Sequence, residues 1–139
     1  MRLEITRRAD LAVRSMTALA EVDGPLKGSQ LAEVLDATPG FMSQVLNPLV
    51  KVGWVASEPG PAGGYHLVAD ISRVSVLDVV EVIDGPTDDG RCVVADRACS
   101  ETTPCALHHA WARARHVLTS TLAGLSLADI SSGAAARPL

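Results

Sequence analysis

The sequence predicts a mainly α-helical protein with a small β-hairpin wing, built as a winged helix-turn-helix that is followed by a long C-terminal dimerisation helix. Two observations predict this fold. In three segments of the first half, apolar residues recur at intervals of three and four, as they do in amphipathic helices. A stretch rich in proline and glycine, 58–65, then separates two short strand-like runs, as the turn of a wing does.

The first two predicted helices precede this wing. The first spans about 6–23 and ends at Gly24-Pro25, because glycine and proline together interrupt a helix. A short second helix follows Gly28, with Ser29 as its N-cap. These helices are the first part of the predicted helix-turn-helix.

The third predicted helix is the one that reads DNA in this fold. Thr38 is suited to its N-cap and Pro39 to its first helical position, and the apolar pattern continues towards Gly53. Pro48 lies inside it and removes one backbone donor, so we expect a kink after Asn47.

Two more helices complete the predicted fold. After strands at 54–56 and 65–68, Ser75 starts a capping box for a helix that Gly85-Pro86 ends. A long helix begins at Pro104 and places one apolar stripe at near-heptad spacing, which predicts a partner helix from a second copy. That stripe comprises Leu107, Trp111, Ala114, Leu118, Leu122 and Leu125.

The composition indicates an ordinary globular protein, 47% hydrophobic and 20% charged, with a net charge of −4. Residues 1–55 carry six basic and six acidic side chains, so the acidic excess lies wholly in the second half. No apolar run approaches the roughly 20 residues that cross a bilayer, so we expect a cytoplasmic protein that does not enter the membrane. No nucleophile–base pair or phosphate-binding loop is recognisable, and we expect no enzyme.

The three cysteines of the chain, Cys92, Cys99 and Cys105, lie in one short stretch. Thiolates grouped in this way are typical ligands of soft metals and iron–sulfur clusters. Three thiolates leave one coordination position open, and the candidates for it are His108, just beyond Cys105, and Asp10 from a partner subunit. A zinc site and a reversible disulfide without metal remain alternatives to the iron–sulfur cluster.

Base-contacting residues of a helix-turn-helix lie at the start of its recognition helix, and a wing adds further contacts. We therefore expect double-stranded DNA to contact Arg2 near the N-terminus, the start of the third helix and the wing. The residues concerned in the helix and the wing are Thr38, Gly40, Phe41, Ser43, Gln44, Gly63, Gly64 and Tyr65.

With these features the chain resembles the winged-helix iron–sulfur transcription regulators of the IscR/NsrR family. The residues that carry the resemblance, besides the three cysteines, are Leu11-Ala12-Val13-Arg14, Pro61-Ala62-Gly63-Gly64-Tyr65 and Cys105-Ala106-Leu107-His108. It implies a homodimer that binds a palindromic promoter site, as a repressor controlled by nitric oxide, redox state or iron–sulfur status. The cluster, of the 2Fe-2S or 4Fe-4S type, would be held by the three cysteines. The fourth ligand would be His108, as in IscR-like members, or the partner subunit's Asp10, as in NsrR-like members.

We accordingly divide the chain into a winged helix-turn-helix DNA-binding domain (1–85), a cysteine-bearing cluster loop (86–104), the dimerisation helix (105–131) and a flexible tail (132–139). Two further functions remain open. One is a thiol-switch or zinc-binding transcription regulator of the same fold. The second is a small electron carrier or scaffold that only holds a cluster.

Overall fold

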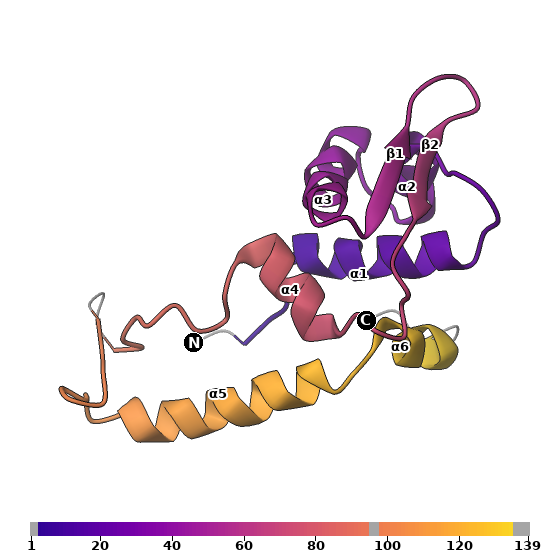
Figure 1. The fold of residues 1–139 in the computed structure, drawn as a ribbon. Coiled ribbons are helices and arrows are strands. Elements are labelled where there is room, and N and C mark those ends of the chain that lie inside the picture. Colours follow the sequence, from indigo (N-terminus) through magenta and orange to yellow (C-terminus); the bar gives the residue numbers. More distant parts are fainter. Residues whose placement is uncertain (1–2, 95–97, 135–139) are drawn as a thin grey trace.

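Helix α1 (Arg7–Ala20) is the element around which the rest of the protein packs. The computed structural model describes residues 3–94 and 98–134, and in it α1 lies against α3, α4, α6 and β2 (Figure 1). Thr6 caps the helix by accepting the backbone N–H of Ala9 at 3.1 Å. The buried side of α1 is mostly aliphatic: Ala9, Leu11, Ala12, Val13, Ser15, Met16 and Leu19.

Helices α2 (Gly28–Val34) and α3 (Pro39–Lys51) form the predicted helix-turn-helix. The expectation that Ser29 caps α2 is wrong, because the helix begins at Gly28 and Lys27 occupies the N-cap position. The Gln30 side chain accepts the Lys27 backbone N–H at 2.8 Å, as the residue three positions after an N-cap does in a capping box.

The start of α3 is confirmed in detail. Thr38 accepts the backbone N–H of Phe41 at 3.2 Å, and Pro39 is the first helical residue. The helix continues across Pro48 to Lys51, so the proline does not end it. Leu49, which follows Pro48, is fully buried in the core.

Strands β1 (Val55–Glu58) and β2 (Gly64–Leu67) form the wing as an antiparallel pair, with Val55 opposite Leu67. The connection between α1 and α2 adds a third piece of strand pairing. The N–H of Leu26 donates to the Tyr65 carbonyl at 2.9 Å, and the N–H of Tyr65 donates to the Leu26 carbonyl at 2.7 Å. The wing is therefore fastened to the helix-turn-helix through its own backbone.

Helix α4 (Val76–Asp84) also begins and ends as predicted. The Ser75 hydroxyl accepts the Asp78 N–H at 3.1 Å, the Asp78 carboxylate accepts the Ser75 N–H at 2.8 Å, and Gly85 follows the last turn. Val76, Val79 and Ile83 face the core, where α4 packs on α1 and α3. The elements from α1 to α4, with the wing, together form what we call the winged head. The cysteine segment, which we define as residues 86–107, follows α4 and extends away from the winged head.

The C-terminal part consists of two helices, α5 (His108–Ala123) and α6 (Leu127–Ala134). The helix predicted from Pro104 thus starts at His108, and it ends at Ala123 because residues 124–127 pair with the segment before α4. In this pairing the N–H of Val76 donates to the Leu125 carbonyl and the N–H of Leu127 donates to the Val74 carbonyl, both at 2.9 Å. Helix α6 includes residues 132–134, which the sequence assigned to the tail, and 135–139 lie outside the described residues.

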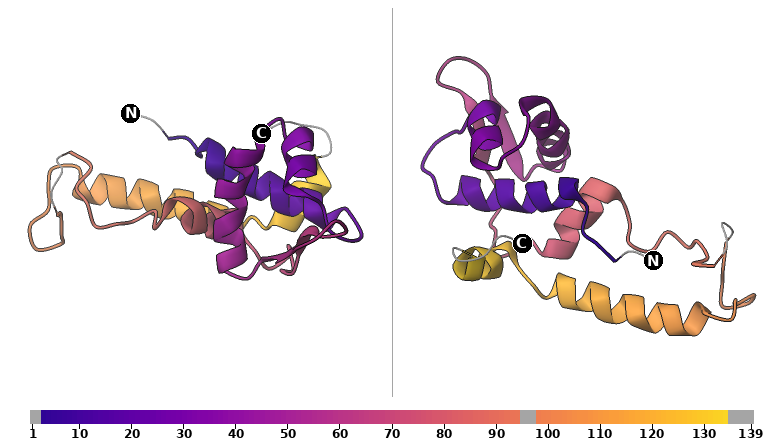
Figure 2. Two further views of the ribbon diagram at one scale, coloured as in Figure 1. Left: turned by 90° about the horizontal axis from the view of Figure 1, so that it is seen from above. Right: turned by 180° about the vertical axis from the view of Figure 1, so that it is seen from behind.

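Helix α5 and the cysteine segment extend away from the winged head, on the side of α1 opposite α3 and the wing (Figures 1 and 2). Helix α6 turns back to the head, where Leu127 is fully buried. None of the helices within 3–94 and 98–134 has the length and apolar character needed to cross a membrane.

Candidate metal centre and DNA-binding surface

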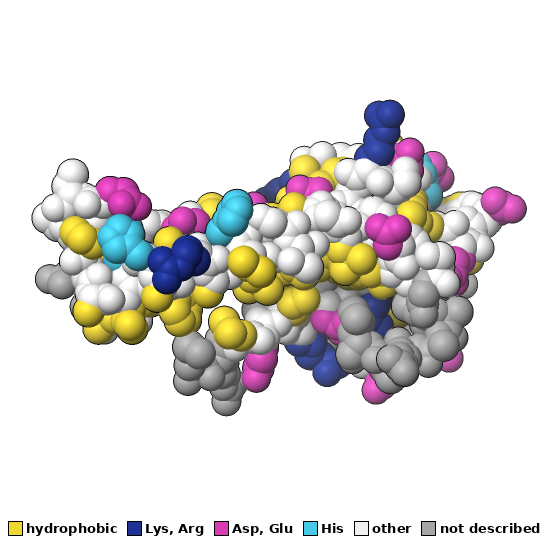
Figure 3. Space-filling view, turned by 90° about the horizontal axis from the view of Figure 1, so that it is seen from below, with side chains coloured by type: hydrophobic (Ala, Val, Ile, Leu, Met, Phe, Trp, Pro, Cys, Tyr) yellow, Lys and Arg dark blue, Asp and Glu magenta, His cyan; other side chains and the backbone are white. Residues whose placement is uncertain are grey.

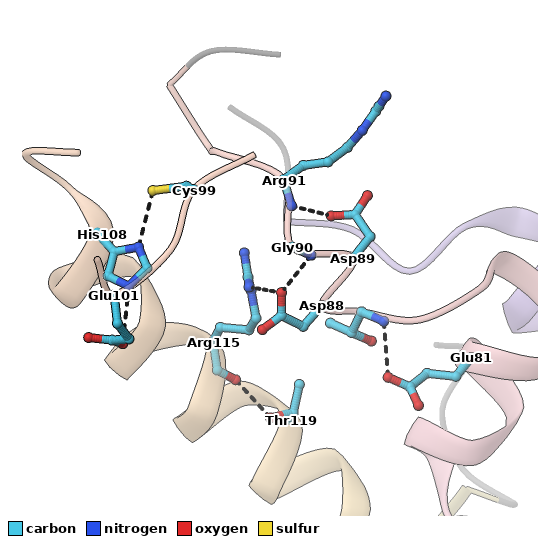
Figure 4. A network of polar contacts seen from close by, with 11 residues as sticks. Glu81, Asp88, Asp89, Gly90, Arg91, Cys99, Glu101, His108, Arg115 and Thr119 are labelled. Carbon is cyan, nitrogen blue, oxygen red and sulfur yellow. Dashed lines mark hydrogen bonds and ion pairs between the residues drawn. The ribbon is translucent and has the colours of Figure 1, made fainter. Parts of the chain in front are cut away.

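The described part of the cysteine segment, 86–94 and 98–107, is held by short-range hydrogen bonds to backbone groups, because it buries few apolar side chains. The Asp88 carboxylate accepts the Gly90 N–H at 3.1 Å, and the Asp89 carboxylate accepts the Arg91 N–H at 3.0 Å. The N–H of Cys99 donates to the Gly90 carbonyl at 3.3 Å. This last bond brings the second cysteine back beside the first part of the segment (Figure 4).

The three thiols converge at one place. The Sγ atoms of Cys92, Cys99 and Cys105 all lie within 4.8 Å of one another, and each residue is half-buried. They line a pocket of about 260 Å³ together with His108 and Trp111 from the first turns of α5. Soft sulfur donors facing one pocket are the set that iron–sulfur clusters and thiolate-bound zinc require, so these residues fit such a group.

His108, the first residue of α5, completes this donor set within the same chain. Its Nδ1 atom lies 3.1 Å from the Cys99 Sγ, and its Nε2 atom lies 3.2 Å from a carboxylate oxygen of Glu101. The His108 side chain is only 16% exposed. The structure therefore brings together all four residues that the sequence named as ligands from one subunit.

The thiols differ in their electrostatic surroundings. The backbone N–H of Cys105 and the ring of His108 lower the pKa of Cys99. The backbone N–H of Leu107 acts in the same direction on Cys105, but burial and the two neighbouring thiols outweigh it and raise the pKa of Cys105. Cys99 and then Glu101 raise the pKa of His108. Of Cys99 and Cys105, the former is thus the one favoured as a thiolate.

Asp10, the alternative fourth ligand, lies on α1 in the winged head, whereas the cysteine segment lies beside the N-terminal end of α5 (Figures 1 and 2). One of its carboxylate oxygens is 3.6 Å from a guanidinium nitrogen of Arg14. Its second oxygen, Oδ1, is buried and has no hydrogen-bond partner within the described part of the chain. Asp10 does not join the cysteines of its own chain, so its role as a ligand from a partner subunit stays a prediction.

The start of α3 and its N-cap present four of the nine predicted DNA-contacting residues. Thr38, Gly40, Ser43 and Gln44 are exposed or half-exposed, while the opposite face of α3 is buried in the core. Phe41 is half-buried and packs against the core, so its side chain contributes to the fold as well as to this surface.

The predicted wing residues have roles inside the wing. A Cβ atom on Gly63 would overlap the Glu58 carbonyl oxygen, and one on Gly64 would lie 2.5 Å from that of Leu26. Tyr65 is half-buried and packs against the core. These positions are therefore needed for the wing to close, and their contact with DNA stays a prediction. Arg2 lies outside the described residues.

Two polar contacts of the cysteine segment were missed from the sequence. Glu101 contacts the His108 ring, and Asp88 forms an ion pair with Arg115 of α5. No periodic signal marks an acidic residue in an irregular segment. The only signal that could have found the ion pair was the position of Arg115, a basic residue two turns after His108.

Comparisons with known proteins agree with this architecture. The family model described as "Rrf2: Iron-dependent Transcriptional regulator" matches residues 5–133. The chain is 30% identical to the HTH-type transcriptional regulator IscR of Yersinia pseudotuberculosis over 130 residues, 92% of this chain and 79% of the relative. It is 29% identical to IscR of Xenorhabdus nematophila over the same shares of both chains.

Solved structures show the same fold. CymR, the global cysteine regulator of B. subtilis, superposes with a TM-score of 0.77 at 24% identity, covering 94% of this chain and 98% of that one. IscR of T. potens superposes with a TM-score of 0.74 at 23% identity, covering 99% and 93%. The relatives are transcription regulators and not enzymes, as the sequence predicted. This chain, with its DNA-binding winged helix, belongs to the Rrf2 family of transcription regulators.

Proposed function

We propose that the chain is a homodimeric, promoter-binding repressor whose affinity for DNA is controlled by an iron–sulfur cluster bound to Cys92, Cys99, Cys105 and His108. The observation that carries this proposal is the convergence of three thiols and one imidazole on a single pocket. A bound cluster would supply an iron centre that responds to nitric oxide, redox state or iron–sulfur supply. We infer that such a regulator works in the cytoplasm, because its thiols must stay reduced and its target is chromosomal DNA.

Helix α5 supports the dimer. It is sixteen residues long and has no buried residue, an unusual state for a helix that carries an apolar stripe. Leu107, Val117 and Leu118 are exposed by 49%, 65% and 44%. Figure 3 shows hydrophobic side chains gathered on the side of the molecule where α5 lies. A second copy of α5 would cover them and would set two winged heads at a fixed separation.

Packing between helices also connects the cysteine segment with the predicted DNA-binding helix α3. Helix α5 packs on α4, α4 packs on α1 and α3, and α3 carries the exposed Ser43 and Gln44. Ligation of the thiols would hold the cysteine segment against the start of α5. Release of that segment would change the relation between α5 and α4, and with it the spacing of two heads that must fit half-sites about one helical turn apart.

The test is anaerobic purification followed by iron and sulfide analysis, a visible absorbance spectrum and a DNA-binding titration. We expect a coloured protein whose promoter affinity changes when the cluster is removed. Cys99→Ala should lose the visible absorbance, whereas Ser120→Ala on exposed α5 should keep it. A colourless, iron-free protein that binds its operator unchanged would refute the proposal.

A thiol switch without iron is the second candidate function, and the thiol geometry gives it specific support. The three Sγ atoms lie within 4.8 Å of one another, and the pKa of Cys99 is lowered, mainly by the backbone N–H of Cys105. A thiolate beside a second thiol is the arrangement from which an oxidant forms a disulfide. Peroxide-dependent DNA binding by an iron- and zinc-free protein would support this candidate, and zinc found by metal analysis would support a structural zinc site.

A further inference from the structure

The His108 ring lies between a thiol and a carboxylate (Figure 4). Its Nδ1 atom is 3.1 Å from the Cys99 Sγ, and its Nε2 atom is 3.2 Å from the Glu101 Oε1. Glu101 belongs to the loop between Cys99 and Cys105, so one short loop supplies two thiols and the carboxylate behind the imidazole. Both ring nitrogens thus have a partner from the cysteine segment.

The chemistry of the two partners decides which nitrogen faces the metal centre. An ionised carboxylate only accepts hydrogen bonds, so the Nε2 atom must carry the proton in the contact with Glu101. When the ring is neutral and Cys99 is a thiol, the lone pair then lies on Nδ1 and accepts the Cys99 S–H, so both contacts are satisfied. A Cys99 thiolate would instead accept from the Nδ1–H of a doubly protonated ring, which is how the ring lowers the pKa of Cys99. A histidine that ligates a metal usually donates its second N–H to a carboxylate, a carbonyl or water in this way.

We propose that Glu101 is a positioning residue, which holds the His108 ring with the Nδ1 lone pair directed at the thiols. The inference rests on the proposed function insofar as that lone pair is meant for a cluster. It also gives the same-chain histidine a pre-oriented ring, which favours His108 over the partner subunit's Asp10 as the fourth ligand.

Among the described groups around the His108 ring, Glu101 is the one that can orient it. Leu107, at the N-cap position of α5, makes no side-chain capping bond, so the cap does not fix the first helical turn. The His109 ring lies edge-on to His108 at 5.1 Å and limits the tilt of the ring without selecting a tautomer. Asp88, a second nearby carboxylate, is engaged by the Gly90 N–H and by Arg115. Glu101 is the carboxylate in hydrogen-bonding contact with the ring among the described residues.

A competing explanation is that the contact is an incidental one at the surface. The Glu101 side chain is 80% exposed, and exposed pairs of this kind contribute little to stability. Stability measurements would therefore not separate the two explanations. The position of the proton on the His108 ring separates the two explanations, because an incidental contact would not hold the proton on Nε2.

The first experiment uses the full chain without a cluster, labelled with ¹⁵N-histidine, at a pH where the ring of His108 is neutral. The parent protein carries Cys99→Ser, so that no thiolate competes for the ring proton at Nδ1. We expect its NMR spectrum to show the proton on Nε2 in the parent and a mixture of tautomers when Glu101→Ala is added. Glu101→Gln should lie closer to the parent, because its amide oxygen still accepts. Asp89→Asn is the matched control: it removes the same charge from the same segment but does not touch His108. A proton on Nδ1 in the parent, or an unchanged tautomer in Glu101→Ala, would overturn the inference.

The second experiment uses the cluster-loaded protein and follows the loss of visible absorbance to an iron chelator. Loss of a carboxylate behind a ligating histidine typically weakens a metal site by roughly 10–100-fold, so we expect cluster loss in Glu101→Ala to be at least about tenfold faster. Asp89→Asn should lose its cluster at the wild-type rate. Equal rates in wild type and Glu101→Ala would refute the role of Glu101. If the wild type binds no cluster, the proposed function fails, and the tautomer measurement still decides whether Glu101 positions the ring.

Discussion

The carboxylate of Asp88 and the guanidinium of Arg115 form an ion pair that joins the start of the cysteine segment to the middle of α5. Arg115 lies seven residues after His108, on the same face of the helix, and both side chains line the pocket of the thiols. The Arg115 side chain is 21% exposed and the Asp88 side chain is 64% exposed, so water screens the pair from the side of Asp88. The segment is thus anchored to α5 at two places, by Asp88 to Arg115 and by Glu101 to His108.

Loss of the ion pair should loosen the segment even without a cluster. We expect Arg115→Gln to speed amide hydrogen exchange within residues 87–92 and to leave exchange in the core of α1 unchanged, because the segment has little further packing. Arg113→Gln is the control, since Arg113 is exposed on the same helix. Equal exchange in the two variants would mean that the ion pair does not anchor the segment.

The stabilising contribution of Asp129, at the start of α6, should decrease at acidic pH. Asp129 accepts the Ser126 hydroxyl at 2.8 Å and the Ser126 N–H at 2.9 Å, and these two bonds hold the pKa of Asp129 below its ordinary 3.8. A carboxyl with a lowered pKa in the folded state stabilises that state above its unfolded pKa and loses this effect as the pH falls through the folded value.

The measurement for Asp129 is the difference in free energy of unfolding between wild type and Asp129→Ala at several pH values. We expect a constant difference in favour of the wild type between about pH 5 and 7, and a decrease below about pH 4. Asp23→Ala, in the exposed connection after α1, is the control and should show no such decrease. A difference that does not change with pH would show that the Ser126 contacts do not depend on the charge of Asp129.

The exposed stripe on α5 predicts a dimer that a single charge should weaken. We expect Leu118→Glu to raise the dimer dissociation constant at least about tenfold, because each buried leucine side chain contributes about 1.5–3 kcal/mol. Sedimentation velocity over a range of concentrations measures the change. Val68→Glu places the same charge on an apolar side chain that is 60% exposed just after the wing, and it should leave the dimer intact. A monomeric wild type at micromolar concentration would refute the prediction.

The head of the protein was predictable because each element carries a local signal. Thr38-Pro39 marks the start of α3 and Ser75 with Asp78 marks the start of α4, and both form in the structure with the expected hydrogen bonds. Ser29 was misassigned because the Gln30 side chain satisfies the orphan N–H of Lys27, a contact that no serine pattern indicates.

The C-terminal half was less predictable because its geometry depends on contacts between distant segments. Helix α5 ends at Ala123 where Leu125 and Leu127 pair with the backbone at 74–76, a pairing invisible to helical periodicity. The grouping of the cysteines was predicted from their spacing alone, whereas Glu101 behind His108 depends on how an irregular segment folds. The sequence thus indicated the ligands but not the residue that orients one of them.

The DNA-binding surface should depend on Gln44, which is exposed near the start of α3. A glutamine amide pairs with both hydrogen-bonding groups on the major-groove edge of adenine, so Gln44→Ala should weaken specific binding by about 1–3 kcal/mol and relax the base preference at one position. Fluorescence anisotropy with the operator and with single-base variants of it measures both effects. Thr121→Ala on α5 is the control, and an unchanged base preference in Gln44→Ala would exclude Gln44 from base reading.

The wing should tolerate a methyl group better at its tip than at its base. Gly60 and Gly64 both have positive φ angles, +97° and +149°, so alanine is strained at either position. A Cβ atom on Gly60 meets open space, whereas one on Gly64 lies 2.5 Å from the Leu26 carbonyl oxygen. We therefore expect Gly64→Ala to lower the free energy of unfolding by about 1–3 kcal/mol more than Gly60→Ala, because the backbone of Leu26 has to move.

Chemical denaturation of the two variants measures this difference, and amide exchange at Leu26 and Tyr65 locates it. Faster exchange at these two residues in Gly64→Ala alone would show that their reciprocal hydrogen bonds fasten the wing to the helix-turn-helix. Equal destabilisation by the two substitutions would mean that φ strain, and not the close approach to Leu26, explains the glycine at position 64. In that case the contact between Leu26 and Tyr65 would not be what sets the position of the wing relative to α3.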